Sequence, residues 1–293
     1  MKLGVLAAPE SWYLADLRRA AGDRYRVDCL SFEQLAASLS GGQSRVRAGE
    51  IDVRAFDAVL VRTMPPGSLE QVVFRMDLLG QLEAAGSVVV NPPRAIEAAV
   101  DKYLTSARLA AVGCPVPETI VCQRVEEAMA GFAELGGDVV IKPLFGSEGR
   151  GMTRVSDPDL ALRAFKMLAQ LGAVLYLQRF VPHDGHDLRL LVIGRRVLAM
   201  RRGNEHDWRT NVSRGAQCQP YEPDDSQVEL ARRAADAIGA CLAGVDLLAG
   251  RDGRTYVLEV NAVPGWKALA ATLKVDVAAL VLDYVASRVE QSR

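Results

Sequence analysis

Two polar side chains interrupt an otherwise apolar stretch near the C-terminal end of the chain. The sequence VLEVNAVPG holds Glu259 and Asn261, and side chains two residues apart in a strand point to the same face. Asp246 lies in the preceding apolar stretch, and the short turn at residues 251–253 makes the two stretches antiparallel neighbours. Two carboxylates and an amide oxygen on one face suit Mg²⁺ completed by phosphate and water, and the alternative is a structural polar network.

A glycine-rich turn follows a lysine in another apolar strand. Lys142 lies in VVIKP, and residues 146–151 read GSEGRG, in which the glycines would let backbone N–H groups approach a phosphate closely. A buried ammonium needs an anionic partner, which a phosphate would supply. Because no Gly-Lys-Ser/Thr sequence is present, the segment is not a P-loop. Taken alone, the turn could equally be a plain β-turn.

Residues 203–216 form a polar segment that contains Arg209, Asn211 and Arg214. The segment lies between a predicted hairpin and the two carboxylate-bearing strands, so guanidinium groups fixed there could stabilise charge on a transferring phosphoryl group. A solvated loop is the usual interpretation of such a run. His206, in the same segment, fits a substrate contact and a surface position equally well.

The elements that must position these residues fall into two patterns. Over the first 90 residues, short apolar runs alternate with helical patterns at residues 12–21 and 69–85, which predicts a parallel sheet covered by helices on both faces. Residues 39–54 are polar and glycine-rich and are expected to form a surface loop. A Rossmann-like domain follows from this pattern, but no G-x-G-x-x-G comes after the first strand, so no dinucleotide is implied.

Beyond a helical connection at residues 91–113, the pattern changes. Strand, helix, hairpin, helix and strand follow one another over residues 118–180, which predicts a small α+β lobe. A hairpin turning at Gly194, a helix at residues 225–240, the two carboxylate-bearing strands and an amphipathic helix at residues 275–289 complete the chain. The expected fold class is therefore α/β combined with α+β.

Composition excludes several classes of function. The 293 residues carry a formal net charge of -1, so no global field favours nucleic acid or an anionic membrane. No apolar run reaches the length needed to span a bilayer and no signal peptide is apparent, so we expect a cytoplasmic protein. Five cysteines without a C-x-x-C pair, and three histidines, favour free thiols over disulfides or a zinc site.

Taken in order, these motifs resemble those of the ATP-grasp fold, and within it the RimK-like α-L-glutamate ligases. The resemblance covers most of the chain from about residue 91 onward, whereas the first 90 residues agree in architecture only. It rests on VDKYLT, VVIKPLFGSEGRGM, LQRFV, HDLRLLV, RTNVSRGA, GVDLL and LEVNAVPG. It implies an N-terminal Rossmann-like domain at residues 1–95, a central ATP-grasp lobe with a glycine-rich lid at residues 96–184, and a C-terminal lobe with the metal site at residues 185–293.

The resemblance also implies a nucleotide site. Lys102 and Lys142 would contact the α- and β-phosphates of ATP. The lid over the phosphates would include Gly146, Ser147, Gly149 and Gly151. The backbone of Arg179 and Phe180 would form the adenine hinge, although many relatives have a glutamate where Arg179 stands, a departure that bears on base selectivity. Asp187 would contact the nucleotide, and Arg209 would lie along it.

The catalytic and metal residues follow from the same resemblance. Arg189, Asn211 and Arg214 would serve catalysis, with Arg214 steadying an acyl phosphate. Asp246, Glu259 and Asn261 would bind two Mg²⁺ ions, with Mn²⁺ as the alternative metal and Glu259 bridging the pair.

The implied chemistry is carboxylate–amine ligation through an acyl phosphate, which requires no nucleophile from the protein. From the resemblance to the RimK-like ligases we expect L-glutamate to be joined to a carboxylate on a small molecule or cofactor. The segment HDWRTNVSRG is similar to that of ligases that glutamylate pterin cofactors such as tetrahydromethanopterin. The alternatives are another amino acid, a protein or carrier-protein acceptor, or a nucleotide-binding regulator without activity. Members of this family often form dimers or tetramers, so a homodimer or homotetramer is compatible with the resemblance.

Overall fold

The N-terminal part of the chain is a four-stranded parallel sheet in the order β2-β1-β6-β7. The computed structural model describes residues 1–146, 149–204, 207–212 and 215–293. The strands are β1 (Lys2–Leu6), β2 (Arg26–Leu30), β6 (Ala58–Val61) and β7 (Val88–Val90). Helix α1 (Trp12–Ala21) packs on one face and α2 (Leu69–Ala84) on the other, so the predicted parallel sheet with helices on both faces is confirmed.

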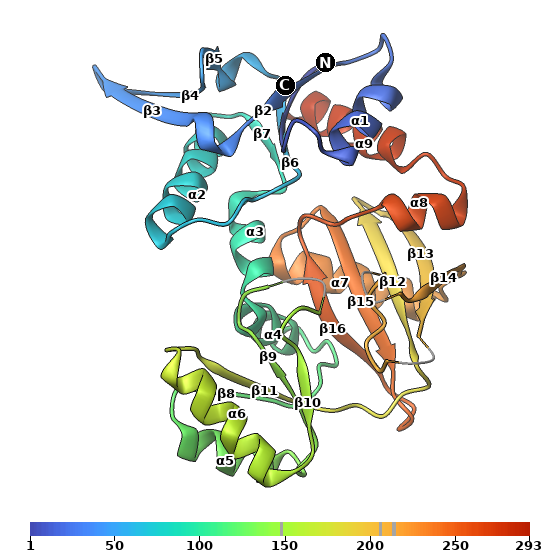
Figure 1. Cartoon of the computed structure of the whole chain (residues 1–293). Helices are drawn as coiled ribbons and strands as arrows, with labels where there is room; N and C mark the ends of the chain where they lie inside the picture. Colours follow the sequence, from blue (N-terminus) through green and yellow to red (C-terminus); the bar gives the residue numbers. More distant parts are fainter. Residues whose placement is uncertain (147–148, 205–206, 213–214) are drawn as a thin grey trace.

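The prediction of a surface loop at residues 39–54 is wrong. The chain forms a small antiparallel sheet of β3 (Leu35–Ser40), β4 (Gln43–Ala48) and β5 (Ile51–Asp52), which extends beside α2 (Figure 1). Val46 and Ala48 are buried while Arg47 between them is exposed, which is the alternation of a strand with one covered face. Gly41 and Gly42 both have positive φ, as a two-residue hairpin turn requires.

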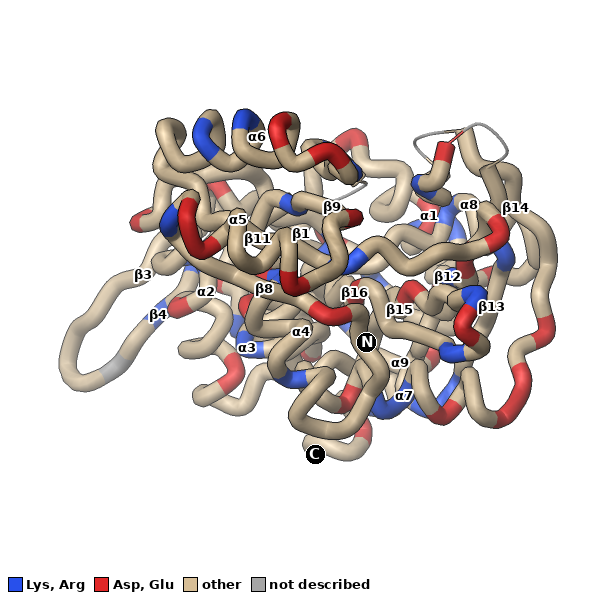
Figure 2. Tube along the Cα trace, turned by 90° about the horizontal axis from the view of Figure 1, so that it is seen from below, with Lys and Arg blue, Asp and Glu red and all other residues tan. Residues whose placement is uncertain are grey.

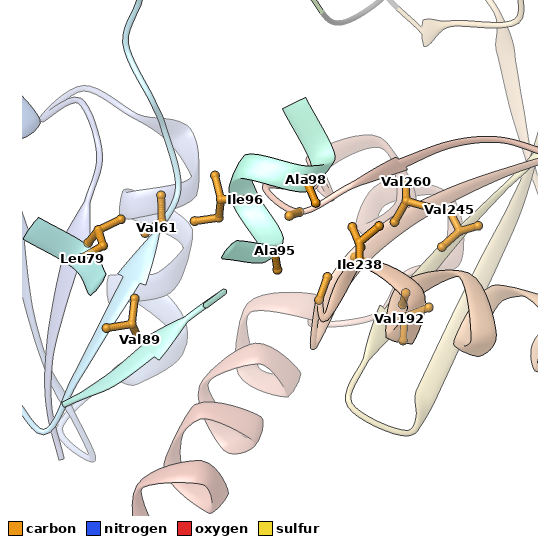
Figure 3. Close-up of a cluster of buried hydrophobic side chains, with 14 of the residues drawn as sticks. Val61, Leu79, Val89, Ala95, Ile96, Ala98, Val192, Ile238, Val245 and Val260 are labelled. Carbon is orange, nitrogen blue, oxygen red and sulfur yellow. The ribbon is translucent and has the colours of Figure 1, made fainter. Parts of the chain in front are cut away.

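Helices α3 (Pro93–Val100) and α4 (Lys102–Ala111) connect the N-terminal sheet to the rest of the molecule. Ala95, Ile96 and Ala98 of α3 lie between side chains of the N-terminal sheet and those of the C-terminal sheet, in one continuous apolar core (Figure 3). The carboxylate of Asp101 caps α4 by accepting from the N–H of Leu104 at 3.0 Å. This cap places Lys102 at the first position of the helix.

The central lobe is an antiparallel sheet in the order β10-β9-β11-β8 with two helices against it (Figure 1). Its elements are β8 (Thr119–Cys122), α5 (Val125–Glu134), β9 (Val139–Lys142), β10 (Thr153–Val155), α6 (Pro158–Gln170) and β11 (Leu175–Arg179). Phe132 of α5 and Phe165 of α6 are buried together against the sheet. The predicted order of elements, including the glycine-turn hairpin of β9 and β10 and the Asp157 cap of α6, is confirmed.

The C-terminal lobe is an antiparallel five-stranded sheet in the order β14-β13-β12-β15-β16. Its strands are β12 (His186–Ile193), β13 (Arg196–Gly203), β14 (Gln217–Pro220), β15 (Leu242–Ala249) and β16 (Thr255–Asn261). Helix α7 (Asp225–Ile238), which begins with a capping box at Asp224 and Gln227, covers one face. The opposite face carries the polar residues of the candidate site, next to α8 (Lys267–Leu273), a helix that was not predicted.

The last helix, α9 (Val277–Ser292), returns to the N-terminal sheet and lies beside α1 (Figure 1). Asp276, at its start, accepts from Arg19 of α1 at 2.8 Å, and Val281 and Val285 are completely buried. The last helix therefore packs against the buried side chains of the N-terminal sheet. Within the described residues, none of the helices is both long enough and apolar enough to cross a membrane.

Candidate active site

The two carboxylate-bearing strands have the predicted register. Asp246 of β15 lies directly opposite Glu259 of β16, and Asn261 lies opposite Gly244, so the three oxygen-bearing side chains share one face. Val245 and Val260 point to the other face and are completely buried. The carboxamide oxygen of Asn261 accepts from the N–H of Val263 at 2.8 Å, which fixes its orientation locally. That these oxygens bind a metal stays a prediction.

Both predicted lysines lie close to these carboxylates. Lys142, on β9, is buried, and its Nζ donates to Oε1 of Gln178 on β11 at 2.6 Å. Burial lowers the pKa of Lys142 to about 8, while the negative charge of Glu259 opposes the shift. Lys102 donates to the carbonyl of Gly146 at 2.6 Å, and burial lowers its pKa as well.

The lowered pKa of Lys142 should make the free energy of unfolding depend on pH. Its folded pKa of about 8 lies below the ordinary value of 10.5, so the unfolded chain binds more protons between these two values. The free energy of unfolding should therefore rise with pH across this window, by about 3 kcal/mol at most. Urea unfolding at several pH values would measure the rise, which the Lys142→Met variant should lack. An identical pH slope in both proteins would contradict the assignment.

A buried network of ion pairs lies behind the carboxylates. Arg202 of β13 donates from Nε and Nη2 to both oxygens of Asp187, at 2.8 and 2.5 Å, and its Nη2 lies 3.1 Å from Asp246. Arg189 of β12 donates to Asp246 at 2.7 Å. Burial alone would raise the pKa of Asp246, but the charges of Arg189 and Arg202 outweigh it and hold the pKa below the usual range. For Asp187 burial prevails and raises the pKa.

Sequence reasoning missed Arg202, although a signal for it existed. The hairpin of β12 and β13 turns at Gly194 and Arg195, and Asp187 and Arg202 are each seven residues from that turn. In an antiparallel hairpin such positions are direct partners, so an acidic and a basic residue at equal distance from the turn predict a cross-strand pair. The structure pairs them as this count requires. Gln178 was missed as well.

The glycine-rich turn packs against the polar segment that follows β13. Gly149 is buried with a φ of 69°, and a Cβ at this position would lie 2.5 Å from Oδ1 of Asn211. Arg209 donates to the carbonyl of Met152 at 3.4 Å and pairs with Asp207 at 2.7 Å. Gly149 therefore has no room for a side chain and needs a conformation that glycine adopts readily. Gly146 and Gly151 also have positive φ, whereas the predicted Ser147, His206 and Arg214 lie outside the described residues.

The proposed hinge offers fewer backbone groups than expected. The N–H of Arg179 donates to the carbonyl of Glu118 at 2.8 Å, and the N–H of Phe180 donates to Asp138 at 2.9 Å. Any backbone hydrogen bond from these two residues to a base would therefore use their carbonyl oxygens. The guanidinium of Arg179 pairs with Glu118. The side chain of Arg179 is therefore held by Glu118.

Phe180, His183 and Trp208 form an aromatic group that was not predicted, called here the Phe180 group. The ring of Phe180 lies 6.0 Å from that of Trp208 in an edge arrangement and 5.8 Å from that of His183. The guanidinium of Arg154 covers the Phe180 ring at 3.5 Å, which is a close cation–π contact. Phe180, His183 and Trp208 line a pocket together with the lysines and carboxylates.

This pocket is lined by residues of the central lobe and of the C-terminal sheet. Nine of the predicted site residues line it: Lys102, Lys142, Arg179, Phe180, Asp187, Arg209, Asn211, Asp246 and Glu259. Arg189 and Asn261 are not among the lining residues, although both lie on the strands that form its wall. A pocket lined by both aromatic and charged side chains suits an amphipathic ligand such as a nucleotide.

The oxygen donors fit Mg²⁺ that arrives with a phosphate ligand. Carboxylate and amide oxygens are the ligands that Mg²⁺ prefers, and one or two carboxylates commonly hold it together with substrate phosphates and water. Asp246 also accepts from two arginines, and the described residues contain no cluster of three or more His, Cys, Asp or Glu side chains that could hold a metal alone. The donor set therefore fits a metal bound jointly with a nucleotide.

Two lobes that enclose two lysines, one of them buried, together with the carboxylates of two adjacent strands are typical of the ATP-grasp class of ligases. Residues 99–285 match the RimK-like ATP-grasp domain, and the chain belongs to this family. It is thus an ATP-dependent ligase, and the N-terminal parallel sheet precedes the family domain.

Named relatives and solved structures agree with this membership. The chain is 32% identical to the tetrahydromethanopterin:alpha-L-glutamate ligase of Methanosarcina acetivorans, over 97% of this chain and 98% of that protein. A RimK domain protein from Sphaerobacter thermophilus superimposes with a TM-score of 0.75 at 26% identity, covering 97% of this chain and 99% of the other. The ATP-grasp ligase PsnB, solved with a minimal precursor, Mg and ADP, has a TM-score of 0.77 at 23% identity and covers 98% and 97%.

Proposed function

We propose that the enzyme joins L-glutamate to a carboxylate of a small molecule or cofactor, of the tetrahydromethanopterin type, through an acyl phosphate. The observation that carries the proposal is the pocket in which Lys102, Lys142 and Glu259 meet beside Asp246. The name of the Methanosarcina acetivorans relative, which aligns over nearly the whole of both chains, supports glutamate and a pterin carboxylate as substrates.

Within this proposal the two lysines bind the phosphates of ATP. Lys142 has a lowered pKa and a buried side chain, so a phosphate in the pocket would supply the anionic partner that favours its charged form. The turn containing Gly146, Gly149 and Gly151 closes over the phosphates, and the Phe180 group contacts the base. The pairing of the buried Lys142 ammonium with a phosphate would contribute binding free energy. The reaction itself needs no nucleophile from the protein.

Asp246, Glu259 and Asn261 would hold two Mg²⁺ ions, with Mn²⁺ as a substitute metal. Mg²⁺ bound there would neutralise charge on the transferring phosphoryl group. Arg189 holds Asp246 in place through its 2.7 Å contact. Asn211, which lies against Gly149, and Arg214 would orient the acyl phosphate.

The proposed reaction has two steps. A carboxylate oxygen of the acceptor attacks the γ-phosphorus of ATP, the bond to the β,γ-bridging oxygen breaks, and ADP leaves. The amine of glutamate then attacks the acyl carbon and loses a proton, and phosphate leaves to give the amide. Arg214 would stabilise negative charge that develops in both steps.

Charge distribution favours a small acceptor over a protein. Lysine and arginine are interspersed with aspartate and glutamate along the chain (Figure 2), and the formal net charge is -1. A protein with a strongly charged tail would be expected to need a docking face of the opposite sign. We further propose a cytoplasmic enzyme, which suits its five free cysteines, and an assembly of two or four copies.

The proposal predicts ADP release that depends on two substrates together. The protein should convert ATP to ADP and phosphate when both L-glutamate and a reduced pterin bearing a carboxylate are present, and mass spectrometry should find the pterin heavier by one glutamyl residue. The Lys142→Met variant serves as the control for contaminating ATPases. Turnover that requires a different amino acid, or a pterin of unchanged mass, would overturn the substrate assignment.

A further inference from the structure

Arg62, immediately after β6 of the N-terminal sheet, is a buried cation without a carboxylate partner among the described residues. It is 4% exposed, and its Nη2 donates to the carbonyl of Pro264 at 2.7 Å. Its guanidinium lies 4.1 Å from the ring of Trp266 and 4.8 Å from that of Tyr13. Nε and Nη1 are buried and have no hydrogen-bond partner in the described part of the chain.

The contact with Pro264 ties Arg62 to the segment that carries the proposed metal ligands. Pro264 lies three residues after Asn261, and Val263 between them donates its N–H to the Asn261 side chain. Tyr13 approaches the same segment so closely that a Cβ on Gly265 would lie 2.6 Å from its hydroxyl oxygen. Residues 262–266 are therefore packed directly against the N-terminal domain.

Asn91, immediately after β7, holds the same segment from a second point. Its Nδ2 donates to the carbonyls of Ala262 at 2.5 Å and Leu242 at 2.7 Å. Its Oδ1 accepts from the N–H groups of Cys241 and Leu242 at 2.8 and 2.9 Å. Two neighbouring strands of the N-terminal sheet thus hold alternate carbonyls, at residues 262 and 264, just beyond Asn261.

We infer that Arg62 is a positioning residue, which fixes the end of β16 and thereby the Asn261 oxygen for Mg²⁺ and nucleotide. The inference rests on the proposed metal site. A buried guanidinium with two nitrogen atoms that have no hydrogen-bond partner among the described residues is costly, and an apolar side chain of similar volume would avoid that cost. The hydrogen bond from Arg62 to the Pro264 carbonyl orients the segment that follows Asn261, and it does so from outside the site. Residues behind metal ligands commonly act in this way.

Arg75 provides a matched control within the same domain. It is also buried, at 5% exposure, and its Nη1 donates to the carbonyl of Pro65 at 2.7 Å. Its guanidinium lies over the ring of Phe32 at 5.9 Å. Arg75 therefore shares burial, a proline carbonyl and an aromatic contact with Arg62, but its proline lies in the N-terminal domain.

The test measures how Mg²⁺ strengthens the binding of ADP. In calorimetric titrations the Arg62→Met variant should need about tenfold more Mg²⁺ for half of the effect, since loss of an outer supporting contact commonly costs 10- to 100-fold in metal affinity. Binding of ADP in the presence of EDTA should be unchanged. Arg62→Lys, which can still donate to Pro264, should recover most of the Mg²⁺ response, and Arg75→Met should match the wild type.

Each remaining outcome decides the question. Equal Mg²⁺ responses in Arg62→Met and Arg75→Met, with both proteins folded by circular dichroism, would overturn the positioning role. Failure of Arg62→Lys to recover would do the same. A wild-type protein whose ADP affinity ignores Mg²⁺ would instead overturn the metal site itself, and the inference with it. An Arg62→Met defect of equal size with and without Mg²⁺ would mark a structural role only.

Discussion

Replacing Glu259 with Gln should abolish ATP-dependent ligation and leave the fold intact. Glu259 lines the pocket directly opposite Asp246, and its negative charge acts on both Lys102 and Lys142. Gln has nearly the same shape but no charge, so it would hold a divalent cation poorly. We expect a loss of about 10³-fold or more in kcat, the size of effect that follows removal of one electrostatic stabiliser of a transition state.

The same substitution has a second expected consequence. Because the charge of Glu259 opposes the burial-driven fall in the pKa of Lys142, its removal should move that pKa further below about 8. Less of the lysine would then be charged at neutral pH, and binding of ADP without metal should weaken as well. Phosphate release and calorimetry would measure the two effects separately.

Glu97→Gln is the control for Glu259→Gln, because Glu97 pairs with Arg94 on α3, away from the pocket. Its activity and thermal midpoint should equal those of the wild type. If Glu259→Gln kept wild-type turnover with the correct substrates, the assignment of the metal site would be wrong. If it failed to fold, as judged by circular dichroism, Glu259→Asp would replace it and should show a smaller loss of kcat at the same stability.

The sequence predicted those parts of the site that depend on short-range geometry. Glu259 and Asn261 lie two residues apart, and a short turn brings Asp246 beside them, so strand periodicity alone places all three on one face. Lys142 and the glycine turn belong to one hairpin and were found for the same reason. Gln178 was not found, since its contact with Lys142 depends on the pairing of β11 with β9 across 36 residues.

Other residues were not predicted because they make contacts between segments that lie far apart in the sequence. Arg62 and Asn91 meet residues 262–264 only because the chain returns to the N-terminal sheet near its end, and no periodicity within either segment indicates that return. The β3–β4 hairpin was missed for a different reason. The glycines and arginines of this hairpin have the composition of a loop. The strand is instead indicated by the alternation of Val46 and Ala48 with exposed residues.

Arg202→Met should cause the largest loss of stability of any substitution considered. Arg202 is 5% exposed and is the shared partner of Asp187 and Asp246, so its removal leaves buried carboxylate charge without compensation. Breaking a buried ion pair from one side costs about 3–5 kcal/mol, and here two acids lose the same partner, although Arg189 still contacts Asp246. Urea unfolding at neutral pH would measure the loss.

The pH dependence separates this electrostatic explanation from a simple packing defect. Burial already raises the pKa of Asp187 in the presence of Arg202, and without Arg202 the shift should be larger. A carboxyl group whose folded pKa is raised destabilises the fold at pH values above that pKa, so the difference between Arg202→Met and wild type should shrink as the pH falls. A difference that stays constant with pH would point to lost packing. Arg251→Met, which breaks the exposed pair with Asp184, should leave the unfolding midpoint unchanged and shows that the effect requires burial.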